Sequence, residues 1–171
     1  NSSDWEDNLE LFLDLVNRGL FPTPVGVSDS HSYTGGRPGL NVTFLGTGTS
    51  DPTELTNDLL LETMLERHTI VSHGPFLSLD VAPGSIVEGG LHVNVQVLSP
   101  SWIEVDRLEL LMDGERIDAR EGEELYRGTS FVVAPEEDAS FVVVAYGSRD
   151  MAPVFSGSYP WAMSSPILVD V

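Results

Sequence analysis

The stretch Leu91-His-Val-Asn-Val-Gln-Val97 alternates apolar and polar side chains along its whole length. Successive side chains of a β-strand point to opposite faces, so this alternation predicts a strand with one buried face and one wet face. Similar short runs, separated by turn residues, occur at 76–81, 107–112, 130–133 and 141–146. Together with a tight hairpin turn at 112–115, these runs predict a small antiparallel β-sandwich.

Upstream of these strands, the chain carries two helical patterns. Ser3-Asp-Trp-Glu6 fits a capping box, and apolar residues follow at helical spacing until Gly19 provides a stop. The second pattern begins with Asp51 as N-cap and Pro52 at the first helical position, and we expect it to end near His68. The sequence therefore predicts one helix before Gly19 and one continuous helix from about 52 to 68.

Two short apolar runs lie between the predicted helices. Val25-Gly-Val-Ser28 is typical of a buried parallel strand, and 41–45 predicts another strand after a loop rich in Gly, Ser, Thr and Pro. The order helix, strand, loop, strand, helix is typical of the closing units of an α/β barrel or of a layered sheet. We therefore expect an α+β protein in which 1–75 forms closing α/β units and 76–171 forms an appended antiparallel β-sandwich.

The composition limits the classes of function. The 171 residues carry a formal charge of −19, from 27 acidic and 8 basic side chains, and all of the basic ones are Arg. This charge repels phosphate backbones and anionic lipid, so we expect no nucleic-acid partner. No apolar run approaches the roughly 20 residues of a membrane span. The chain has no cysteine, which excludes disulfides and thiolate metal sites and leaves the compartment open.

The strongest chemical candidates are Asp29 and His31, directly after the predicted strand at 25–28. The chain has four histidines, and His31 stands two residues from a carboxylate. An Asp-x-His pair combines ligands that suit zinc, manganese or iron. The spacing alone also fits a turn with a surface histidine, and both interpretations stay open at this point.

The surrounding sequence resembles a known family. Val25-Gly-Val-Ser-Asp-Ser-His-Ser32, with Gly35-Gly-Arg-Pro38, resembles the last metal-binding motif of PHP-domain (polymerase and histidinol phosphatase) proteins, especially CehA/McbA-like metallohydrolases. The stretch 59–75 resembles the helix, strand and Asn-Gly-Pro-like turn that follow this motif, with His73 in place of a small polar residue. The stretches 108–115 and 160–167 resemble the appended β module of that family, so the resemblance extends along nearly the whole chain.

The resemblance implies a distorted βα barrel with two or three divalent metals, which activate water to hydrolyse phosphate esters or related esters and amides. It implies that Asp29 and His31 are metal ligands. The family's first motif is a His-x-His, which this chain lacks. We therefore expect the C-terminal part of a larger hydrolase, with a partner PHP region that supplies the remaining ligands and little activity in this chain alone.

Two further residues are candidates for contacting the substrate. Arg37 could bind an anionic ester, because a guanidinium matches phosphate oxygens in a bidentate way. His73, beside Gly74-Pro75, could face the same cleft. The alternatives are a solvated loop arginine and a turn histidine bonded to the backbone. At the level of the whole chain, the alternative function is a non-enzymatic module whose sandwich recognises a partner or glycan.

Overall fold

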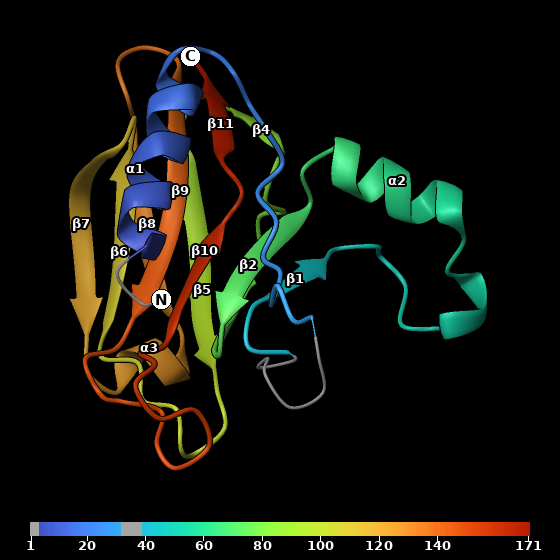
Figure 1. Cartoon of the computed structure of the whole chain (residues 1–171). Helices are drawn as coiled ribbons and strands as arrows, with labels where there is room; N and C mark the ends of the chain where they lie inside the picture. Colours follow the sequence, from blue (N-terminus) through green and yellow to red (C-terminus); the bar gives the residue numbers. More distant parts are fainter. Residues whose placement is uncertain (1–3, 32–38) are drawn as a thin grey trace.

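The computed structural model describes residues 4–31 and 39–171, and within these ranges two β-sheets pack face to face (Figure 1). The smaller sheet has three strands in the order β3-β5-β8, and all of its pairs are antiparallel. Its strands are β3 (Phe76–Leu79), β5 (Leu91–Leu98) and β8 (Thr129–Val133). The predicted sandwich is therefore confirmed for this layer, and the alternating stretch at 91–97 forms its central strand.

The larger sheet contains eight strands of the described chain. The order across it is β7-β6-β9-β10-β2-β1, and β11 continues beyond β10 along the same side of β9. Strand β4 pairs with β11 in parallel. The bounds are β1 (Val42–Leu45), β2 (Thr69–His73), β4 (Ile86–Glu88), β6 (Arg107–Met112), β7 (Glu115–Glu121), β9 (Ala139–Tyr146), β10 (Trp161–Ser164) and β11 (Ile167–Asp170).

The hydrophobic core lies between the two sheets. Its fully buried members include Leu77, Val93, Leu110, Phe131 and Phe141, which come from strands of both layers. The short helix α3 (Glu124–Arg127) closes one end of the sandwich with a buried Leu125. Burying large apolar side chains from both sheets is the main favourable contribution to this fold.

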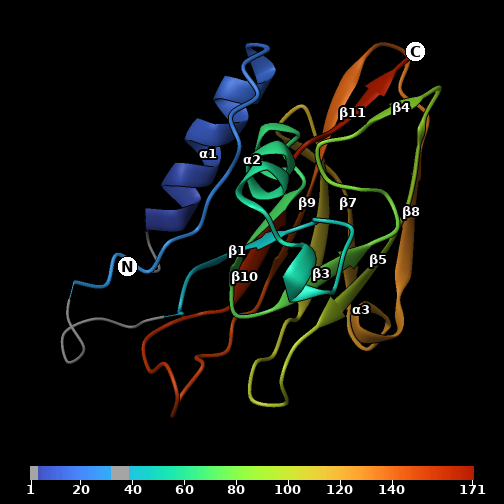
Figure 2. The same cartoon turned by 90° about the vertical axis from the view of Figure 1, so that its right-hand side faces the viewer.

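Helix α1 (Asp4–Asn17) covers the outer face of the larger sheet (Figures 1 and 2). Leu13 packs there in a second apolar cluster with Val142, Val144 and Met163, so this sheet is buried on both faces. Gly19 follows the helix with φ +75°, a left-handed conformation that favours glycine. The predicted first helix and its stop are confirmed.

The predicted continuous second helix is wrong. Asp51 does cap a turn, but the turn is the 3-10 helix η1 (Pro52–Glu54), and the chain then becomes extended at Leu55 and Thr56. Thr56 accepts a hydrogen bond from the backbone of Leu59 and so starts the separate helix α2 (Asn57–Leu65). A second good N-cap therefore divides the segment, and α2 lies at the β1 edge of the larger sheet (Figure 1).

The predicted strand at 25–28 is also wrong, because residues 20–31 have no regular secondary structure. The segment is held mainly through threonine hydroxyls: the Gly26 N–H donates to Thr43 Oγ1 (2.8 Å), and Thr69 Oγ1 donates to the Pro24 carbonyl (3.2 Å). Val25 and Val27 are exposed. The segment lies beside β1 without joining the sheet.

The class α+β is confirmed, and the sheets are mostly antiparallel, with β4 and β11 as a parallel pair in the larger sheet. Strands β1 and β2 pair antiparallel, and β2 also pairs antiparallel with β10, so described residues on both sides of position 75 share one sheet. The boundary at 75 itself stays a prediction. Among the helices of the described ranges, none is long and apolar enough to cross a membrane.

Candidate functional site

The structure brings Asp29 and His31 into contact. His31 Nε2 lies 2.9 Å from Asp29 Oδ1, and the two side chains are 86% and 85% exposed. Asp29 has φ +49°, a left-handed conformation that aspartate tolerates better than most residues and that turns the chain here. The expected strand end is replaced by this turn, and the pair is open to solvent.

The hydrogen bonds of the 20–31 segment give its direction. Pro24 lies at Thr69, the first residue of β2, and Gly26 lies at Thr43, which pairs with Val71 two residues further along β2. The segment therefore runs in the same direction as β2. A methyl group on Gly26 would lie 2.8 Å from the Val42 carbonyl oxygen, so glycine is required for this close approach.

His73, at the end of β2, has a different environment. Its side chain is buried, its Nδ1 contacts Asn41 Oδ1, and its ring stacks on Trp161 at a centroid distance of 6.0 Å. Trp161 in turn stacks on Trp5 of α1 at 5.2 Å. These contacts fix the imidazole beside Asn41 and Trp161, and Trp161 links it to α1. The predicted substrate contact of His73 stays a prediction. Its burial and its bond favour a structural role, in which it holds Asn41 directly before the first strand of the larger sheet.

The other candidates add no third ligand to the pair. Arg37 lies outside the described residues. His68 stands 3.6 Å from Glu66, and His92 is exposed on β5. Across 4–31 and 39–171, no group of three or more His, Cys, Asp or Glu side chains could hold a metal ion. The described site thus offers two donors, fewer than the three protein ligands that catalytic zinc normally takes.

Sequence reasoning missed a charged cluster around the buried Glu109, beside α1. The Glu109 carboxylate accepts from Arg107 Nε (2.6 Å) and Arg116 Nη1 (2.9 Å), and it is hydrogen-bonded to Tyr146. Burial acts to raise the pKa of Glu109, but the bonds from Tyr146 and both arginines outweigh it and lower that pKa. Burial and the neighbouring carboxylate raise the pKa of Tyr146. The alternation of polar and apolar residues along β6 could have predicted part of this cluster, because it places residues 107 and 109 on the same face of the strand.

No protein-family model, curated protein or solved structure matches this chain.

Proposed function

We propose that this chain is the C-terminal region of a PHP-like metal-dependent hydrolase, a phosphoesterase, in which Asp29 and His31 are two of the metal ligands. The observation that carries the proposal is their 2.9 Å contact, with both side chains open to solvent. A carboxylate and an imidazole at one point suit zinc, manganese or iron.

The residues fit such an ion as part of a larger ligand set. A bound metal would supply an activated water and neutralise charge on the oxygen of a small ester or phosphoester substrate. Asp29 and His31 would hold the ion, and the turn at Asp29 keeps them together. The remaining ligands come, in this proposal, from a PHP region outside residues 1–171, so this chain alone binds metal weakly and has little activity.

The direction of the 20–31 segment also supports the proposal. It runs in the same direction as β2, as strands do in a βα barrel, whereas β1 contacts both and is antiparallel to them, which such a barrel does not have. In this proposal, residues 1–75 are the closing units of that barrel, and the sandwich supports them.

The test is made on the intact gene product that contains this chain. We expect the purified protein to carry zinc, manganese or iron, measured by elemental analysis, and to lose about tenfold or more of its metal affinity in Asp29→Ala and in His31→Ala, since loss of a ligand weakens binding at least as much as loss of a supporting group. His92→Ala is the matched control, because His92 is also an exposed histidine but lies on β5.

Two results would contradict the proposed hydrolase function. One is unchanged metal content in Asp29→Ala and His31→Ala, and the other is a gene product without further His and Asp or Glu ligands. Either result favours the alternative, a binding module built on the sandwich.

A further inference from the structure

Helix α2 exposes apolar side chains that nothing in the described chain covers. Of its nine residues, Thr63 is the buried one, and Leu61, Met64 and Leu65 are exposed. Residues 61, 64 and 65 fall at helical spacings of three and four, so they form one apolar stripe. The hydrogen bond from Thr63 Oγ1 to the Leu59 carbonyl and the half-buried Leu59 mark the opposite, inward side.

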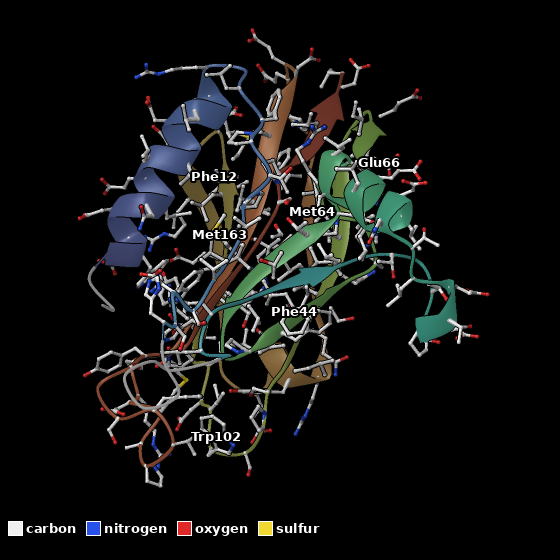
Figure 3. All side chains as sticks on the ribbon, turned by 45° about the vertical axis from the view of Figure 1, so that its right-hand side comes forward. Phe12, Phe44, Met64, Glu66, Trp102 and Met163 are labelled. Atoms are coloured by element: carbon white, nitrogen blue, oxygen red, sulfur yellow. The ribbon has the colours of Figure 1, made fainter. Side chains whose placement is uncertain are left out.

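The segment that carries the metal-ligand pair is joined to the end of α2 and has exposed apolar side chains of its own. Thr23 Oγ1 donates to the Met64 carbonyl (2.6 Å), which ties the segment to the end of α2. Val25 and Val27 follow with 53% and 68% of their surface exposed, and Asp29 comes two residues later. We call Val25, Val27, Leu61, Met64 and Leu65 the α2 face. Figure 3 shows Met64 on the side of α2 that faces α1 and the 20–31 segment.

We propose that the α2 face is the docking surface for the PHP region that supplies the remaining metal ligands. This inference rests on the proposed function, and it adds where and how the two parts meet. Any polypeptide that completes a metal centre at Asp29 and His31 must pass next to Val25 and Val27, because these residues lie on the same short segment. Clustered exposed apolar side chains mark such contact surfaces.

Charge decides between this occupant and a second copy of the chain. Between 51 and 66 there are five acidic residues and no basic one, and all five side chains are exposed. Two copies meeting at this face would bring these carboxylates together on chains that each carry −19. Like charges at a contact disfavour association. The occupant therefore combines an apolar face with a neutral or basic rim.

Hydrogen–deuterium exchange tests the surface. We expect amides of 57–65 to exchange about tenfold more slowly in the intact gene product than in residues 1–171 alone, because docking suppresses local opening of α2. Leu61→Ser in the intact protein should restore fast exchange there and reduce the apparent metal affinity about tenfold. Leu11→Ser is the matched control: Leu11 is 59% exposed on α1 and Leu61 is 58% exposed on α2. Residues 1–171 carrying Leu61→Ser should keep the circular dichroism spectrum of the unmodified chain.

The outcomes separate this inference from the proposed function. Equal exchange of 57–65 in both proteins, with metal still lost in His31→Ala, overturns the docking surface alone. Slow exchange of 57–65 with metal retained in His31→Ala keeps the docking surface and overturns the metal site. Concentration-dependent protection of 57–65 in residues 1–171 alone shows that a second copy is the occupant and overturns our assignment.

Discussion

The Glu109 carboxylate forms ion pairs with two arginines, Arg107 and Arg116, and a hydrogen bond with Tyr146. Replacing Glu109 with Gln keeps its volume but removes the carboxylate that Arg107 and Arg116 share, while Arg107 keeps its contact with Glu121. We expect Glu109→Gln to lower the free energy of unfolding by about 2 kcal/mol at pH 7, since hydrogen bonds to charged groups contribute at that level. Urea denaturation measures the loss.

The pH dependence of that loss has a definite sign. The pKa of Glu109 is lowered in the folded state, so its stabilisation is present above the unfolded pKa of about 4.5 and disappears as pH falls through the folded value. The difference in free energy of unfolding between the unmodified chain and Glu109→Gln should therefore become smaller below about pH 4.5. Glu121→Gln is the control: Glu121 also contacts Arg107, at 3.3 Å, but is mostly exposed, and its loss should cost less than about 0.5 kcal/mol. Equal losses in both variants would contradict this account.

Residue-level features differ in how far the sequence could predict them. The contact between Asp29 and His31 follows from their spacing, because side chains that are two positions apart in a turn can reach each other. His73 and Asn41 are 32 positions apart, and their contact depends on the register of β1 against β2. Register across long sequence separations is set by packing of the whole sheet, so no local pattern predicted this pair.

At the level of elements, the β6–β7 hairpin has a direct test. Its two-residue turn has φ +50° at Asp113 and +81° at Gly114, values typical of a type I′ turn. A methyl group on Gly114 would also lie 3.1 Å from Asn17 Nδ2, and that amide donates to the Asp113 carbonyl. The turn therefore holds the end of α1 as well as the hairpin.

We expect Gly114→Ala to destabilise the protein by about 2 kcal/mol, about half from the left-handed backbone and half from crowding against α1. Gly122→Ala isolates the first contribution, since Gly122 has the same φ of +81° with nothing within 4 Å. Thermal unfolding followed by circular dichroism compares the two. If both variants lose equal stability, the contact between the turn and α1 contributes nothing.

Helices and strands were predictable where a single sequence pattern, alternation or helical spacing, covered the whole element. Strands β5 and β6 and helix α1 match their predicted ranges closely, because alternation or helical spacing continues to a clear stop. The segment 25–28 has the composition of a buried strand, yet Pro22 and Pro24 provide no N–H before it and threonine hydroxyls replace a backbone ladder. Amino-acid composition indicates whether the side chains suit a strand. It does not indicate whether a neighbouring strand is available to pair with the backbone.

At the scale of the whole molecule, the position of β2 decides how the chain unfolds. Strand β2 lies between β1 and β10, and α1 covers the sheet that contains both. Removing residues 1–75 would leave β10 as an open edge and expose Val142, Val144 and Met163 to water. An open edge beside exposed apolar residues favours association between chains.

We therefore expect residues 1–171 to unfold in one transition, with tryptophan fluorescence and circular dichroism coincident, because Trp5 and Trp161 stack across the interface between α1 and the sheet. Residues 76–171 alone should unfold at lower urea and self-associate in light scattering. Residues 18–171, which keep β2 but lack α1, separate the effect of the lost strand from that of the lost helix. A monomeric 76–171 with undiminished stability would instead make position 75 a true domain boundary, because the larger sheet would then not need β2 to be stable.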